Sequence, residues 1–89
     1  MPNYRILFHR KADKALEGLD EKTKLRVIED ILLLEKFPEF ETTPDIAKME
    51  GQKDLYRLRT GKIRTVFTVD KATKTITILK IAQREAAYE

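Results

Sequence analysis

The sequence predicts an α+β fold in which an N-terminal strand and a helical hairpin pack on a mainly antiparallel, four-stranded sheet. Alternation of apolar and polar side chains at period two appears in residues 3–8 and again after residue 54. Between these segments, apolar side chains recur at helical spacing. The chain has 89 residues, which is the size of one domain, so residues 1–89 are expected to form a single two-layer unit.

The first expected strand covers residues 3–8, and two helices follow it. The first helix ends between Gly18 and Asp20, because its apolar positions lie three and four residues apart at Ala12, Ala15, Leu16 and Leu19. The second covers residues 21–37, with Asp20 as its cap and Pro38 preventing its continuation. The short joint between the helices predicts antiparallel neighbours.

The second half of the chain predicts a loop and then three strands. Residues 38–54 contain proline and glycine without periodicity, which predicts a surface loop with a helical turn near residues 46–50. Strands are expected at residues 55–60, 63–70 and 75–81, all rich in β-branched and aromatic side chains. The joints between them have the lengths of hairpin loops, so these strands should run antiparallel.

Composition excludes several function classes. The chain has no cysteine, so it cannot form a disulfide, a thiolate zinc site or a thiol nucleophile, and a reducing, cytoplasmic setting is expected. Its single histidine, His9, lies between the first strand and helix, where a cap or surface role is expected. No Gly-rich phosphate loop is present, and no metal or cofactor site is expected. No apolar run approaches the ~20 residues of a membrane span, and no signal peptide is recognised.

Positive charge is concentrated in the second half of the chain. Residues 1–50 hold 9 Lys and Arg against 11 Asp and Glu, whereas residues 51–89 hold 9 against 4. A basic surface of this kind fits an anionic partner such as nucleic acid. The alternative is a surface that only keeps the protein soluble.

Three arginines are expected on one face of one hairpin. Gly61 and Lys62 suit a two-residue type II′ turn, which places Thr60 opposite Ile63, Arg59 opposite Arg64 and Arg57 opposite Val66. Like charges directly opposed in a sheet cost a few tenths to about 1 kcal/mol, so an anionic ligand between Arg59 and Arg64 is expected. The alternative is that these arginines pair with acidic side chains of the loop on a solvent face. An exposed strand position is expected for Arg64, with little cost in folding when it is replaced.

The order of these elements and their motifs resembles the RelE toxins of the RelE/ParE superfamily, the toxin halves of type II toxin–antitoxin pairs. The resemblance covers nearly the whole chain. Its most specific parts are Lys48-Met49-Glu50-Gly51, Leu55-Tyr56-Arg57-Leu58-Arg59, Gly61 with Arg64 three residues later, and Arg84 with Tyr88 four residues later.

The resemblance implies an enzyme that enters the ribosomal A site and cleaves messenger RNA there by attack of a 2′-hydroxyl on the adjacent phosphate. It implies the catalytic residues Arg57, Arg59, Arg64, Arg84 and Tyr88, with Lys48, Lys62 and Lys80 contacting RNA, and no cofactor. It also implies a cognate RelB-like antitoxin, bound in a heterodimer or heterotetramer. The chain departs from the family in having arginines where some members have lysines on the second strand, one tail arginine where many have two, and Ile63 where an aromatic is common.

Two other functions stay open. One is that of the ParE-like branch, which poisons DNA gyrase and generally lacks the basic cluster with the tail tyrosine. The other is a non-catalytic RNA-binding module, in which arginines contact phosphates without cleavage.

Overall fold

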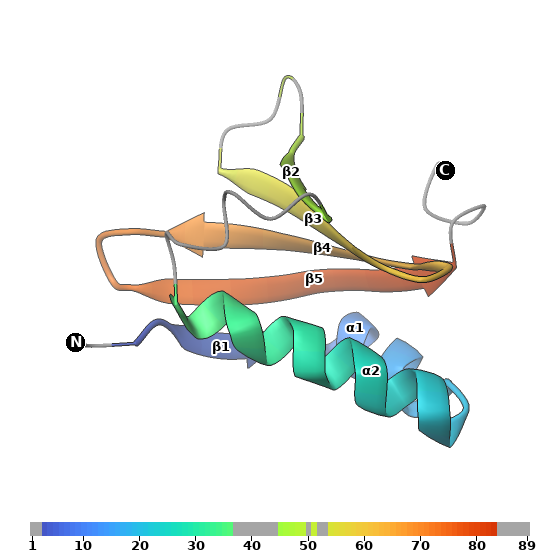
Figure 1. Cartoon of the computed structure of the whole chain (residues 1–89). Coiled ribbons are helices and arrows are strands. Elements are labelled where there is room, and N and C mark those ends of the chain that lie inside the picture. The colour runs from blue at the N-terminus through green and yellow to red at the C-terminus, as the bar shows by residue number, and fades with distance from the viewer. Residues whose placement is uncertain (1–2, 37–44, 50, 52–53, 84–89) are drawn as a thin grey trace.

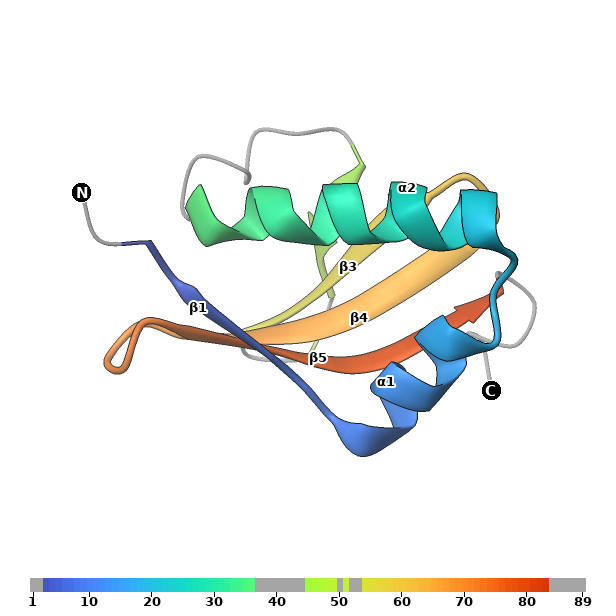
Figure 2. The ribbon, with the colours of Figure 1, turned by 90° about the horizontal axis from the view of Figure 1, so that it is seen from below.

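The computed structural model describes residues 3–36, 45–49, 51 and 54–83 (Figure 1). This part of the chain forms five strands, two α-helices and one 3₁₀ helix. They are β1 (Arg5–Phe8), α1 (Arg10–Glu17), α2 (Glu21–Leu32), η1 (Leu33–Lys36), β2 (Ile46–Lys48), β3 (Leu55–Thr60), β4 (Ile63–Asp70) and β5 (Thr75–Gln83). The predicted α+β architecture is confirmed, with the helices on one face of the sheet (Figures 1 and 2).

The sheet has five strands in the order β1-β5-β4-β3-β2, not four. The additional strand, β2, lies where a helical turn in a loop was predicted, and that prediction is wrong. Backbone bonds from Arg59 N to Asp45 O and from Met49 N to Leu55 O hold both ends of this three-residue strand against β3. The pairs β2–β3, β3–β4 and β4–β5 are antiparallel, and β1 runs parallel to β5.

Both helices begin at capping side chains: Asp20, as the sequence predicts, and His9, for which a cap or a surface role was expected. The His9 side chain accepts a hydrogen bond from Lys11 N at 3.1 Å, and the Asp20 carboxylate accepts one from Thr23 N at 3.1 Å. Hydrogen bonding by the Thr23 side chain, and next by the Thr23 backbone N–H, lowers the pKa of Asp20, as expected for a carboxylate that caps a helix. The second helix is shorter than predicted, because α2 ends at Leu32 and continues as the 3₁₀ helix η1.

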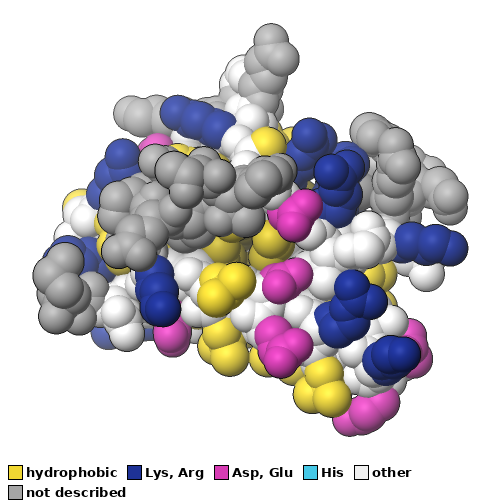
Figure 3. Space-filling view, viewed as in Figure 1, with side chains coloured by type: hydrophobic (Ala, Val, Ile, Leu, Met, Phe, Trp, Pro, Cys, Tyr) yellow, Lys and Arg dark blue, Asp and Glu magenta, His cyan; other side chains and the backbone are white. Residues whose placement is uncertain are grey.

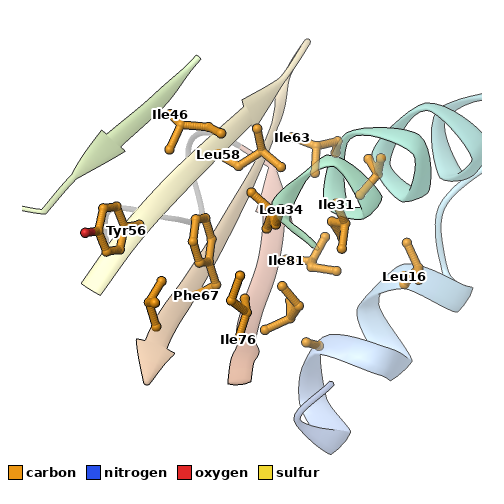
Figure 4. Packing of buried hydrophobic residues seen from close by; sticks show 14 residues of the cluster. Leu16, Ile31, Leu34, Ile46, Tyr56, Leu58, Ile63, Phe67, Ile76 and Ile81 are labelled. Carbon is orange, nitrogen blue, oxygen red and sulfur yellow. The ribbon is translucent and has the colours of Figure 1, made fainter. Parts of the chain in front are cut away.

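The core lies between the helices and one face of the sheet (Figure 4). Its buried hydrophobic side chains are Ala12, Leu16, Val27, Ile31, Leu34, Ile46, Tyr56, Leu58, Ile63, Phe67, Val69, Ile76, Ile78 and Ile81. On β3 the buried residues alternate with exposed Arg57 and Arg59, so the period-two pattern separates a core face from an outer face.

The turn between β4 and β5 contains a strained residue, which gives a test of stability. Lys74 has a φ of 54°, a left-handed conformation that a side chain disfavours. Replacing Lys74 with glycine should therefore stabilise the fold by about 0.5–1 kcal/mol in chemical denaturation, after allowing for the greater freedom of glycine in the unfolded chain. The matched change at Ala72, which does not have positive φ, should destabilise by a similar amount. Equal effects of the two glycines would contradict this account.

Candidate functional site

The β3–β4 hairpin has the register that the sequence predicts. Arg59 pairs with Arg64, Arg57 with Val66 and Thr60 with Ile63. Gly61 has a φ of 58° and Lys62 does not have positive φ, as a type II′ turn requires. Since directly opposed residues share a face, Arg57, Arg59 and Arg64 lie together on the outer face of the sheet, away from the helices.

The core face fixes this hairpin at both ends. Near the turn, the Thr60 hydroxyl donates a hydrogen bond of 2.7 Å to the Asp30 carboxylate of α2. At the other end, the rings of Tyr56 and Phe67 stack with centroids 5.5 Å apart and planes 10° apart. The Thr60 bond therefore holds the turn end of the hairpin against α2, and the ring stacking holds β3 and β4 together at the other end, both from the face opposite the arginines.

A β-bulge brings Lys80 to the same outer face. Val66 pairs with Lys80 but Phe67 pairs with Ile78, so Leu79 is an extra residue on β5. The bulge reverses the alternation after Ile78, so that Lys80 follows Arg57 and Val66 in one row across the sheet. Without it, strict alternation from Ile78 would direct Lys80 into the core.

Arg64 is buried, not exposed as the sequence predicted. Its side chain is 8% exposed, whereas Arg57 and Arg59 are exposed. The reason is its strand: β4 is central among five strands, so neighbouring side chains flank Arg64 on both sides. In its own row these neighbours are Arg59 on β3 and Ala82 on β5.

The other predicted site residues, Lys48, Lys62, Arg84 and Tyr88, are not placed beside the three arginines and Lys80 by the described structure. Lys62 lies in the exposed turn at the end of the hairpin. Lys48 pairs with buried Tyr56, so it belongs to the core face, where it lines a hollow of about 260 Å³ with Ile46, Asp54, Tyr56 and Lys71. Arg84 and Tyr88 lie outside the described residues. The structure thus unites Arg57, Arg59, Arg64 and Lys80, which we call the cationic face.

The surroundings of the cationic face favour an anion over an internal ion pair. Within the described part of the chain, no ion pair joins Arg57 or Arg59 to a carboxylate. Asp70, at the far end of β4, accepts hydrogen bonds from Ala72 N and Thr73 N in its own turn. Guanidinium groups that share one face of a sheet can bind a phosphate by paired hydrogen bonds.

The described residues form neither a metal-binding cluster nor a membrane-spanning helix. The described residues include no group of three or more His, Cys, Asp or Glu side chains that could hold a metal ion. No helix among them has the length and apolar character needed to cross a membrane.

Comparison with known proteins identifies relatives over nearly the whole chain. The sequence model of the ParE toxin of type II toxin–antitoxin systems, parDE, matches residues 6–88. Toxin RelE1 of Methanocaldococcus jannaschii is 30% identical over 86 residues, which are 97% of this chain and 96% of the relative. A chain of the archaeal RelE–RelB complex from Pyrococcus horikoshii OT3 is 36% identical, with a TM-score of 0.79 over 92% of this chain and 96% of that chain. The isolated Escherichia coli RelE toxin shares the fold, with a TM-score of 0.78 at 17% identity over 90% of this chain and 83% of that chain.

Proposed function

The chain belongs to the ParE toxin family of type II toxin–antitoxin systems, and from this membership we propose that it is a RelE-type endoribonuclease that cuts messenger RNA in the ribosomal A site. The observation that carries this proposal is the cationic face, in which opposed Arg59 and Arg64 lie beside Arg57 and Lys80. Because the proposed target is messenger RNA on the ribosome, the protein would act in the cytoplasm.

The proposed reaction is a transfer within the RNA backbone. The 2′-oxygen loses its proton and bonds to the adjacent phosphorus, and the bond to the 5′-oxygen breaks. The products are a 2′,3′-cyclic phosphate and a 5′-hydroxyl, so no water or cofactor is consumed. The transition state carries an additional negative charge on the phosphate, which a preorganised guanidinium such as that of Arg64 would stabilise. Arginine stays protonated at neutral pH, so Arg57, Arg59 and Arg64 would stabilise charge without donating a proton.

The general base proposed from the family pattern is Tyr88, and Arg84 is a proposed further cation. Tyrosine ordinarily titrates near pH 10, but neighbouring positive charge favours the phenolate. Replacing Tyr88 with phenylalanine keeps the ring and removes the hydroxyl, so it should lower the single-turnover cleavage rate by about a hundred- to ten-thousand-fold. A Phe variant that cleaves at the parent rate would make Tyr88 a packing residue.

The proposed partner is a RelB-like antitoxin, since the 36% identical relative was solved as a RelE–RelB complex. We expect an acidic segment of it to cover the cationic face or to displace the tail that carries Tyr88. Reversing Arg59 to glutamate should then weaken the complex about tenfold or more in titration calorimetry, and salt should weaken the parent complex further. A complex insensitive to this reversal, to salt and to removal of the tail would show that the antitoxin binds elsewhere.

A second candidate function is gyrase inhibition, because the matching family model is that of ParE. The cationic face argues for RNA, since a contact with gyrase does not need opposed arginines. A supercoiling assay with purified gyrase distinguishes the two functions.

The experiment that tests the proposed function is primer extension on a message under translation, with purified protein added. We expect breaks within the codon in the A site and 2′,3′-cyclic phosphate at the new ends. Binding to RNA without breaks would instead support a non-catalytic RNA-binding module.

A further inference from the structure

The reaction proposed above needs a proton donor, and the three arginines of the cationic face cannot supply one. When the bond from phosphorus to the 5′-oxygen breaks, its electron pair goes to that oxygen, which gains a proton to leave as a hydroxyl. Arginine keeps its proton in proteins, so Arg57, Arg59 and Arg64 stabilise charge only. A lysine ammonium group carries a positive charge as well and can also give up a proton.

Lys80 is the lysine that the described structure places beside these arginines. Among the described residues, Lys48 and Lys80 are the lysines that lie in strands, and Lys48 lies on the core face. Lys62, in the turn of the arginine hairpin, lines a hollow on the helix side of the sheet together with Arg26 of α2. A donor on the outer face is therefore sought in Lys80.

The bulge at Leu79 sets Lys80 close to the arginines. Lys80 pairs with Val66, which pairs with Arg57 on its other side. Neighbouring strands lie about 4.8 Å apart, so the backbones at Lys80 and Arg57 are roughly 10 Å apart across Val66. Arg64 lies two residues before Val66 on β4, which makes it a diagonal neighbour of Lys80, within reach of a long side chain. A phosphate bound between Arg57 and Arg64 would then have Lys80 beside it.

The surroundings of Lys80 leave its ammonium group to a ligand. The side chain is half-buried, and within the described part of the chain no carboxylate forms an ion pair with it. Figure 3 shows acidic side chains over α2, which packs on the other face of the sheet. Asp70, four residues along β4 from Val66, accepts hydrogen bonds in its own turn.

We propose that Lys80 is the general acid of RNA cleavage, an assignment that rests on the proposed function. Its ammonium group gives a proton to the 5′-oxygen while the bond from that oxygen to phosphorus breaks. Lys80 is then a neutral amine and regains a proton from solvent, and the proton of the 2′-hydroxyl goes to the base. The 2′-oxygen attacks in line with the leaving oxygen, so the two proton transfers lie on opposite sides of phosphorus and need two groups. Lys80 serves one transfer and does not align the message, so positioning by the ribosome is still needed.

Lys80→Arg separates proton transfer from charge, because arginine keeps the positive charge but does not donate its proton. On programmed ribosomes we expect its single-turnover cleavage to be about a hundredfold or more slower than that of the parent. Lys80→Met, which also removes the charge, should be slower still. Thermal unfolding of each variant verifies that the fold is kept. Lys14→Arg, the same change on exposed α1, should cleave at the parent rate.

A message with sulfur in place of the 5′-bridging oxygen tests the donor directly. A thiolate leaves without being protonated, so on this substrate the loss caused by Lys80→Arg should shrink to less than about threefold. Arg64→Met should lose the same factor on both substrates, because its guanidinium acts on the charge of the phosphate.

Two results would overturn the assignment of Lys80. One is a Lys80→Arg variant that cleaves the oxygen substrate at the parent rate, since charge alone would then suffice. The other is that both Lys80 variants lose the same factor on the oxygen and sulfur substrates, which would make Lys80 a contact for RNA. A parent chain that cleaves neither substrate on the ribosome is a different outcome, because the proposed function itself then fails and the assignment falls with it.

Discussion

Replacing Arg64 with methionine is expected to lower the rate of RNA cleavage by about ten- to a thousand-fold, the effect of losing one preorganised donor to a developing charge. Methionine keeps an unbranched stem in the space that the buried arginine fills, so the fold should lose less than about 1.5 kcal/mol. Arg64→Ala should lower the rate similarly but destabilise more, because it leaves a void beneath the outer face. Single-turnover cleavage and thermal unfolding of each variant measure the two effects separately.

A matched change outside the cationic face controls for loss of charge. Arg10→Met removes a guanidinium from exposed α1 and should change neither the rate nor the melting temperature appreciably. If Arg64→Met cleaves like the parent, Arg64 does not stabilise the transition state. If it unfolds the domain instead, the buried guanidinium is a structural group.

Arg59, which pairs with Arg64 across the hairpin, can be tested by the same measurements of cleavage and stability. Arg59 is exposed and directly faces Arg64, so removing it relieves repulsion between like charges. Arg59→Thr should therefore stabilise the fold by about 0.2–1 kcal/mol while cleavage slows. Opposite effects on stability and activity are expected of residues that are placed for a ligand and not for the fold.

The register of the arginine hairpin could be predicted because one short loop determines it. Gly61 and Lys62 allow a two-residue turn, and that turn alone fixes which residues of β3 and β4 face each other. The helix caps His9 and Asp20 were equally predictable, since a cap depends on residues two or three positions away. Local chemistry therefore sufficed for these features.

Features that depend on distant strands were not predictable in the same way. The burial of Arg64 requires β4 to lie inside the sheet with β3 on one side and β5 on the other, and the pairing with β5 is not determined by the hairpin turn. Three residues are too few to show alternation, so β2 was taken for a helical turn. Pairing with β3 placed Lys48 on the core face.

The bulge did leave a signal in the sequence. Isoleucines follow one another at spacing two from Ile76 to Ile78 and then at spacing three to Ile81. Such a break in the period of a strand indicates an inserted residue, here Leu79. It would have predicted that Lys80 joins the arginines.

Cleavage of naked single-stranded RNA is expected to be slower than cleavage of the same message on the ribosome by a factor on the order of 10³ or more. The described residues supply fixed positive charge on an open sheet face, but no histidine or carboxylate pair on that face to move protons. The ribosome would hold the message so that the 2′-oxygen, phosphorus and leaving oxygen are in line, and positioning of this kind can remove several kcal/mol from a barrier. Single-turnover rates on free message and on programmed ribosomes, at equal enzyme concentration, measure the ratio.

The Arg59→Thr variant should lose activity on both substrates by the same factor, because charge stabilisation and positioning are separate contributions. Equal rates on free and ribosome-bound message would mean that the chain carries its complete catalytic apparatus, and the base and acid would then have to be sought within it.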